Sequence, residues 1–215
     1  ASNNPQERMN WLRLARSENV GPKTFKKLIE LYGNATTSIE KAQELAANGG
    51  LKRKIKISSI SEVENEIQKT LDYGAQIILS CDKTFPQKLK QIDDCPAAII
   101  VKGSIENLNK QKCVAVVGAR NASVNGCSFA KELANDLAKT GIIIASGLAL
   151  GIDTYAHQGS INHCSIGVIA GGINNIYPPQ NKKLFEEIVL NGAIIAELPI
   201  NTAPLAKHFP QRNRI

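Results

Sequence analysis

From residue 75 onward, short apolar runs alternate with stretches whose apolar positions fall at helical spacing. The runs are AQIILS (75–80), AAIIVKG (97–103), CVAVV (113–117), IIIAS (142–146), SIGVIAG (165–171) and AIIAE (193–197). Helical spacing appears around Phe129–Ala138, Asp153–His163 and Lys182–Leu190. Nearly continuous apolar strands are typical of a parallel sheet that helices cover on both faces. The pattern therefore predicts an α/β domain with a mostly parallel sheet.

Before residue 74 the pattern is helical only. It predicts a helix over residues 7–17 and a second one that begins at Pro22 and ends at Gly33. Two more helices are expected to begin at the capping boxes Thr37–Glu40 and Ser61–Glu64, and Gly74 should end the last one. We predict a small all-α domain over residues 1–73 and the α/β domain over residues 74–215.

The turn at Gly21-Pro22 has two interpretations. A helix, a VGP turn and a second helix resemble a helix-hairpin-helix, in which backbone amides grip a nucleic-acid phosphate. An ordinary turn in a helical bundle gives the same pattern, and we favour it. Lys23, Lys26 and Lys27 fit both. The basic run at residues 52–54 is expected to be an exposed connector.

Three strands of the predicted sheet end in polar, glycine-rich loops. The segments are Cys113–Gly126, Ile142–Asp153 and Ser165–Pro178. A strand, a glycine loop and a helix start together present free backbone N–H groups to an anion. Ligands of such sheets bind outside the carboxyl ends of the strands. The sequence therefore predicts a row of phosphate-sized sites and a polyanionic ligand.

The loops do not fit a dinucleotide. After Gly118 the next glycine is Gly126, and the strand that ends at Gly147 has no acidic residue for a ribose. We therefore expect neither a nicotinamide nor a flavin, and no other cofactor. Arg120 offers a planar fork suited to phosphate. Ser123, Asn125 and Ser146 lie beside it in the loops. The alternative, that the glycines only allow tight turns, stays open for some of them.

Candidate catalytic residues are few. Asp153 is expected to be a helix N-cap, and His157, four residues on, is expected to be structural. No GxSxG nucleophile accompanies them. Glu197 could act as a lone general base or could hold a loop by accepting backbone N–H bonds. We expect no catalytic residue, no metal site and no enzymatic activity.

The segment LAKHFPQRNRI places Lys207, Arg212 and Arg214 around Phe209. Charge for the backbone and a ring for a base are what single-stranded nucleic acid needs. A core phenylalanine with solvated arginines explains the pattern equally well. The 26 basic and 19 acidic residues give a net charge of +7, which also favours a polyanionic partner.

Five cysteines without CxxC spacing argue against disulfides and zinc and fit a reducing cytosol. No secretory signal is visible, and no apolar run reaches the roughly 20 residues of a membrane helix. We therefore expect a cytoplasmic protein without a membrane partner.

Six motifs together resemble one family. They are VGAR (117–120), SGLALGID (146–153), AH (156–157), YPPQN (177–181), ELP (197–199) and FPQRNR (209–214). Their order and spacing resemble the DprA family, also called Smf, the DNA-processing proteins of bacterial transformation. SGLALGID and FPQRNR carry most of the specificity. The N-terminal helices are similar to that family's sterile-alpha-motif-like or helix-hairpin-helix domain.

The resemblance implies an extended Rossmann-like domain that binds and protects single-stranded DNA, forms a homodimer and helps to load RecA during natural transformation and recombination, without catalysis. It implies that Arg120 contacts phosphate, that Phe209 stacks on a base and that Asn213 organises its loop. The implied DNA-binding set is Gly118, Arg120, Ser123, Asn125, Ser146, Gly147, Lys207, Phe209, Arg212, Asn213 and Arg214.

The chain departs from the family's pattern at two places. Ala119 stands where the family more often has serine, which removes a hydroxyl from the first loop. The family's Rossmann domain continues after the RNR motif, and many members add a winged-helix domain. We therefore expect further core structure after Ile215.

Two other functions are compatible with the loops. One is nucleotide binding by a Rossmann-like protein. The other is a nucleoside-monophosphate phosphoribohydrolase, whose PGGxGTxxE loop shares paired glycines with AGGINNIYP (170–178). This chain lacks the following Gly-Thr and the catalytic glutamate. Salt dependence separates the first function from the DNA hypothesis, because only a path of several phosphate contacts loses affinity steeply with salt.

Overall fold

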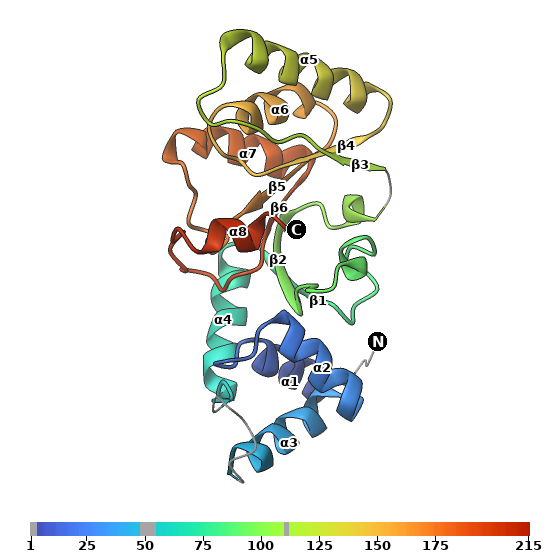
Figure 1. Ribbon diagram of the computed structural model, residues 1–215, viewed down its shortest axis with the longest axis vertical. Helices are drawn as coiled ribbons and strands as arrows, with labels where there is room; N and C mark the ends of the chain where they lie inside the picture. The colour runs from blue at the N-terminus through green and yellow to red at the C-terminus, as the bar shows by residue number, and fades with distance from the viewer. Residues whose placement is uncertain (1–3, 48–54, 110–111) are drawn as a thin grey trace. The chain divides into compact units, whose positions relative to one another are not determined.

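The computed structural model describes residues 4–47, 55–109 and 112–215 (Figure 1). The predicted basic connector at residues 52–54 lies outside these ranges. The helices are α1 (Pro5–Ala15), α2 (Pro22–Tyr32), α3 (Ala35–Ala47), α4 (Ile60–Asp72), α5 (Val124–Lys139), α6 (Ile152–Ser160), α7 (Lys182–Asn191) and α8 (His208–Arg212). The strands are β1 (Gln76–Leu79), β2 (Ala98–Gly103), β3 (Cys113–Ala115), β4 (Ile143–Ser146), β5 (Ser165–Ile169) and β6 (Ala193–Ala196). Short 3-10 turns lie at Leu89–Gln91, Glu106–Leu108 and Pro179–Asn181.

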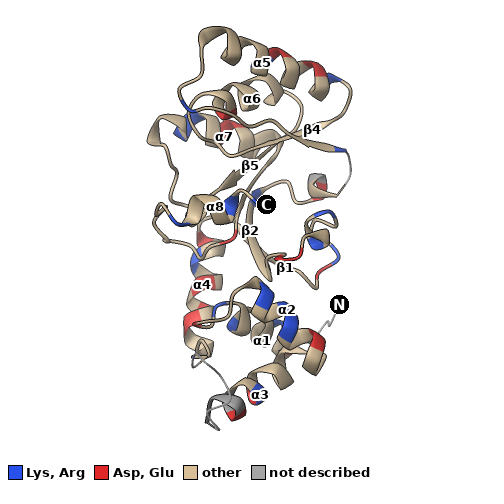
Figure 2. Cartoon of the chain, viewed as in Figure 1, with Lys and Arg blue, Asp and Glu red and all other residues tan. Residues whose placement is uncertain are grey.

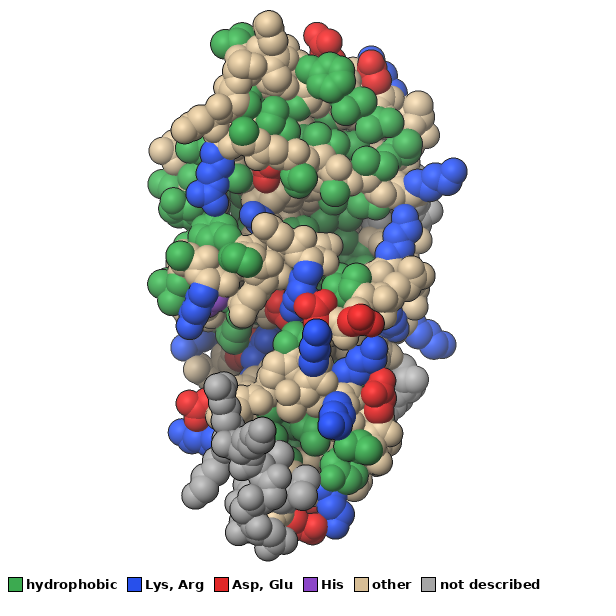
Figure 3. All heavy atoms as spheres, in the orientation of Figure 1, with side chains coloured by type: hydrophobic (Ala, Val, Ile, Leu, Met, Phe, Trp, Pro, Cys, Tyr) green, Lys and Arg blue, Asp and Glu red, His purple; other side chains and the backbone are tan. Residues whose placement is uncertain are grey.

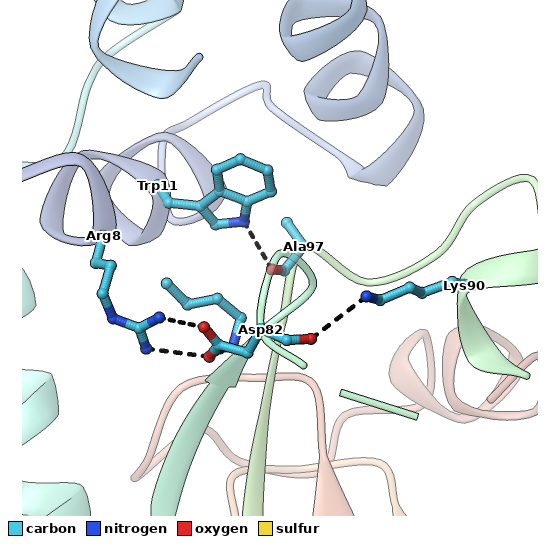
Figure 4. Close-up of polar contacts among 6 residues, drawn as sticks. Arg8, Trp11, Asp82, Lys90 and Ala97 are labelled. Atoms are coloured by element: carbon cyan, nitrogen blue, oxygen red, sulfur yellow. Dashed lines mark hydrogen bonds and ion pairs between the residues drawn. The ribbon is translucent and has the colours of Figure 1, made fainter. Parts of the chain in front are cut away.

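The first of two compact units contains residues 1–69 and 77–99. Its helices enclose a core of apolar side chains that includes Leu14, Phe25 and Leu28. The Trp11 ring meets Phe25 edge-on, with centroids 5.1 Å apart. Trp11 Nε1 donates to the carbonyl oxygen of Ala97 at 3.0 Å (Figure 4). The indole therefore ties α1 to the segment that precedes β2.

The segment from residue 77 to 99 belongs with the N-terminal helices, which differs from the predicted boundary at residue 73. Arg8 on α1 holds the Asp82 carboxylate through two guanidinium nitrogens, and Lys90 donates to the Asp82 carbonyl at 3.3 Å (Figure 4). Leu12 and Leu79 share an apolar cluster with Val63 and Ala98. These contacts join parts of the chain that a boundary drawn along the sequence would separate.

The start of α3 differs from the prediction. The Asn34 side chain caps this helix by accepting the Thr37 N–H at 2.8 Å, and Glu7 accepts the N–H groups of Ala35 and Thr36. Ser38 lies inside the helix, where its buried hydroxyl donates to the Leu28 carbonyl at 3.1 Å. The predicted capping box at Thr37–Glu40 is therefore wrong.

The capping box of α4 lies two residues earlier than predicted. Ser59 Oγ accepts the Glu62 N–H at 3.2 Å, and Glu62 Oε2 accepts the Ser59 N–H at 2.7 Å. This reciprocal pair satisfies two backbone donors that have no partner within the helix. Gly74 follows α4 with φ +71°, a conformation that glycine adopts without steric cost.

The second unit contains residues 70–76 and 100–215. The six strands of the described residues form one sheet in the order β1-β2-β6-β5-β4-β3, and β3 to β6 with most of β2 belong to this unit (Figure 1). Strands β3, β4, β5 and β6 pair in parallel, and β2 pairs with β6 in the antiparallel direction. The predicted mostly parallel sheet is confirmed.

The two faces of this sheet differ. Ile144 packs with Ala134, Ala138 and Ala156, so its face of β4 carries α5 and α6. The crossovers from β3 to β6 all step in one direction along the sheet, and right-handed crossovers then place α5, α6 and α7 on that same face. Because side chains alternate along a strand, Ala145 points to the opposite face. There it lines a pocket with residues of α8, which contacts β5.

Apolar side chains gather over α5 and the neighbouring edge of the sheet (Figure 3). The exposed members are Val114, Val117, Val124, Phe129 and Leu133.

None of the helices in the described ranges has the length and apolar character needed to cross a bilayer.

Candidate nucleic-acid interface

Alanines on adjacent strands leave room for a pocket. Ala115 and Ala145 are register partners on β3 and β4, and both face away from α5 and α6. Larger side chains there would fill the space. With Val168 on β5 they line a cavity of about 440 Å³ beside α8, which we call the strand-end pocket. It is bounded further by Val117, Gly118, Arg120, Ser146, Gly147, Ala149, Asp153, Phe209, Arg212, Asn213 and Ile215.

The Asp153 carboxylate occupies the backbone donors of two strand-end loops. Its Oδ2 accepts the Gly147 N–H at 3.0 Å, and its Oδ1 lies 3.4 Å from the Gly118 nitrogen. The prediction of a helix N-cap is wrong, because Gly151 takes that position and the Asp153 carboxylate binds the amides of the two loops instead. Asp153 is 5% exposed. The amides that we expected to bind a phosphate are thus already bound to an anion of the chain itself.

Arg212 binds the carbonyl oxygens at the strand ends, whereas Asp153 binds the N–H groups. Its guanidinium donates to the carbonyl oxygens of Gly147 and Val168, and its Nε donates to Asn213 Oδ1 at 3.0 Å. Burial lowers the pKa of Arg212, the charge of Asp153 opposes this shift, and the charge of Arg120 adds to it. Arg212 therefore anchors α8 to the ends of β4 and β5 rather than standing free for a ligand.

The loop after β4 is held in an uncommon conformation. Leu148 has φ +56° and is fully buried. Asn181, from the YPPQN motif, donates to the Leu148 carbonyl at 2.9 Å and to Thr154 Oγ1 at 2.9 Å. At Gly151, where φ is +74°, a side chain would meet the carbonyl oxygens of Ala119 and Arg120. The loop is therefore fixed by packing and hydrogen bonds before any ligand arrives.

The rim of the strand-end pocket combines a cation with aromatic rings. Arg120 is exposed, and its guanidinium carbon lies 5.2 Å from the centre of the Phe209 ring. The Tyr177 ring meets Phe209 edge-on, with centroids 5.8 Å apart. Arg120 comes from the loop after β3, Tyr177 from the loop after β5, and Phe209 from α8. The fold brings these three segments, which are distant in sequence, together at the carboxyl ends of the strands.

The other predicted site residues have different positions. Ser146 is buried, and its hydroxyl donates to the Val116 carbonyl at 2.7 Å. Ser123 caps α5 by accepting the Gly126 N–H at 3.2 Å. Asn125 and Lys207 are exposed and do not line the pocket. Figure 2 shows basic positions on and around α8, and both acidic and basic positions on α5.

Glu197 and His157 have structural partners. Glu197 forms an ion pair with Arg214. His157 is fully buried, with Nδ1 at 2.7 Å from Ser165 Oγ. Burial lowers the pKa of His157 to about 3; the Ser146 backbone opposes the shift and the charge of Arg212 reinforces it. A neutral imidazole sealed from solvent supports the structural role that we favoured.

Some pocket residues were missed by the sequence analysis. Ala115 and Ala145 form the floor, and the signal for them is present in CVAVV and IIIAS, where alanine takes equivalent positions in otherwise β-branched runs. Tyr177 was noted only as part of a motif. Across the residues that the structure describes, no three His, Cys, Asp or Glu side chains come together in a way that could hold a metal.

A protein-family model described as DNA recombination-mediator protein A matches residues 76–215. The chain belongs to this family. A second model, described as a DprA-like N-terminal HHH domain, matches residues 5–68. It supports the helix-hairpin-helix interpretation of the Gly21-Pro22 turn over the ordinary turn that we favoured.

Named relatives agree with this family. The chain is 38% identical to DNA processing protein DprA of Bacillus subtilis over 146 residues, which is 67% of this chain and 49% of the relative. It is 32% identical to protein Smf of a Synechocystis species over 220 residues, 97% of this chain and 55% of the relative. The chain thus spans about half the length of these relatives.

Solved structures of the family share the fold. The X-ray structure of DprA from Streptococcus pneumoniae matches 99% of this chain and 74% of its own, with a TM-score of 0.78 and 25% identity. DprA from Helicobacter pylori, whose structure is described in terms of a single-stranded DNA binding mode, matches 65% of this chain and 62% of its own. For that match the TM-score is 0.58 and the identity 29%.

Proposed function

We propose that this chain binds single-stranded DNA at the strand-end pocket. The observation that carries the proposal is the rim, where the exposed Arg120 guanidinium lies against the Phe209 ring above an apolar floor. A guanidinium can pair with a phosphate, and a ring can stack on a base. The single-stranded DNA binding mode described for the Helicobacter pylori relative supports the same ligand.

The geometry favours single strands over duplex. Stacking on Phe209 requires a base whose face is accessible, and duplex DNA buries both faces of its bases. The alanine floor and the apolar Val168 offer contacts to a base but no hydrogen-bond pattern that would read its identity. We therefore expect binding with little dependence on sequence.

The test is fluorescence anisotropy with a labelled oligothymidine and a labelled duplex, titrated over a series of salt concentrations. We expect tighter binding of the single strand and a linear fall of log K with log salt concentration. Equal affinity for the duplex, or no binding of the single strand, would contradict the proposal.

A small nucleotide is the second candidate ligand, and the volume of the pocket favours it. About 440 Å³ lies within the range of about 300–1,000 Å³ typical of small-molecule sites. Thymidine monophosphate, added as a competitor to the same titration, separates the two. Displacement of the oligonucleotide at micromolar competitor would favour the nucleotide, whereas persistence at millimolar competitor would favour DNA.

Within the same proposal, the DNA-bound chain helps to load RecA and acts without catalysis during transformation. The family's description as a recombination mediator supports this role, and the structural roles of His157 and Glu197 support the absence of catalysis. We also propose a homodimer, which the exposed apolar side chains on α5 and β3 support. The rate of RecA filament growth on single strands coated with this chain tests the RecA role. The molar mass from light scattering tests the homodimer.

A further inference from the structure

Two partly exposed aromatic rings meet at the rim of the strand-end pocket. Most phenylalanines of the chain serve the core, as Phe25, Phe85 and Phe185 do, each at 4% exposure or less. Tyr177 is 46% exposed, and its ring lies at 68° to that of Phe209. A ring that is nearly half exposed beside a candidate ligand site contributes little to the core. It is therefore available to a ligand.

A small recess extends from the pocket toward Tyr177. It shares Arg120, Gly147, Ala149 and Phe209 with the strand-end pocket, and it adds Leu150, Tyr177 and Pro178. Its volume of about 40 Å³ is small beside the 440 Å³ of the strand-end pocket, so a flat group would lie across it rather than inside it. Among the residues that the structure describes, no acidic side chain lines the recess, and Leu150 is 40% exposed.

We propose that Tyr177 forms a second base-stacking position on single-stranded DNA, adjacent to Phe209. In this arrangement the strand runs from the strand-end pocket over Phe209 to Tyr177 and Leu150. Arg120 lies against Phe209 and lines both cavities, so it can hold the phosphate that links the two bases. The position accepts any base, because every base has a π-face. This inference rests on the proposed function and extends it to a neighbouring nucleotide.

The test compares Tyr177→Ala and Tyr177→Phe with the unaltered chain in the oligothymidine titration. We expect Tyr177→Ala to weaken binding by about fivefold or more, and Tyr177→Phe to bind as the unaltered chain does, because the ring is retained. Tyr155→Ala is the matched control: Tyr155 is 37% exposed on α6 and lines neither cavity. Its affinity should not change. Thermal melting of each variant confirms that the fold is intact.

An abasic oligonucleotide of the same length removes the base and keeps the phosphates. The difference between Tyr177→Ala and the unaltered chain should vanish with this ligand. An equal loss in Tyr177→Phe would overturn the inference, because it would assign the contact to the hydroxyl. Unchanged affinity of Tyr177→Ala, with the unaltered chain binding well, would overturn this inference alone. Failure of the unaltered chain to bind oligothymidine would overturn the proposed function itself.

Discussion

Replacing Asp153 with asparagine should lower the free energy of unfolding by about 3 kcal/mol. Both carboxylate oxygens face backbone N–H groups, those of Gly118 and Gly147. Asparagine offers one acceptor, so its amide group would face an N–H donor, and a buried donor without a partner costs about 1–3 kcal/mol. Arg212 would also lose the negative charge that opposes the lowering of its pKa.

Urea unfolding followed by circular dichroism measures this loss through the shift of the transition midpoint. Circular dichroism is the suitable probe, because the one tryptophan, Trp11, lies in the other unit. Asp136→Asn is the matched control. Asp136 is exposed on α5 and pairs with Lys139 at 3.5 Å, a surface contact worth about 0.5 kcal/mol or less. Equal losses in the two variants would show that Asp153 does not organise the strand ends.

The order of helices and strands was predictable because buried positions are apolar and recur with the period of a helix or a strand. The apolar runs from residue 75 onward gave the strands, and the structure confirms the mostly parallel sheet. The direction of β2 was not predictable, since an apolar run reads the same in an antiparallel pair. The starts of α3 and α4 were misplaced because candidate caps recur at residues 34–38 and 59–62. Glu7, distant in sequence, selects the start of α3 by accepting its first N–H groups.

The candidate site was predictable only in part. Glycine loops at strand ends pointed to an anion, and the motifs named Arg120 and Phe209, which lie together at the rim. The internal role of Asp153 could not be predicted, because its partner Gly118 is 35 residues away and the contact depends on sheet register. The pairing of Arg214 with Glu197 is hidden for the same reason. A sequence shows which charges are present but not which of them neutralise one another.

Because Arg212 and Arg214 already have partners within the chain, Arg120 is the residue whose loss should most affect DNA affinity. Arg212 donates to the carbonyls of Gly147 and Val168, and Arg214 pairs with Glu197, whereas Arg120 is exposed at the rim. Arg120→Ala should weaken oligothymidine binding by about tenfold or more, since a charge-assisted hydrogen bond contributes about 1.5–3 kcal/mol. The slope of log K against log salt concentration should become shallower by about 0.7, the value for one phosphate contact on a single strand.

Three further variants show whether the effect of Arg120→Ala comes from a phosphate contact at the strand-end pocket. Phe209→Ala should also weaken binding but should leave the salt slope unchanged, because stacking releases no counterions. Arg120→Lys should keep the slope and lose part of the affinity, because lysine keeps the charge without the planar fork. Lys131→Ala removes an exposed cation of α5 that does not line the pocket, and should change neither quantity appreciably. If Arg120→Ala behaved like Lys131→Ala, the DNA path would have to avoid the strand-end pocket, and the basic residues outside it, Lys207 first, would be its next candidates.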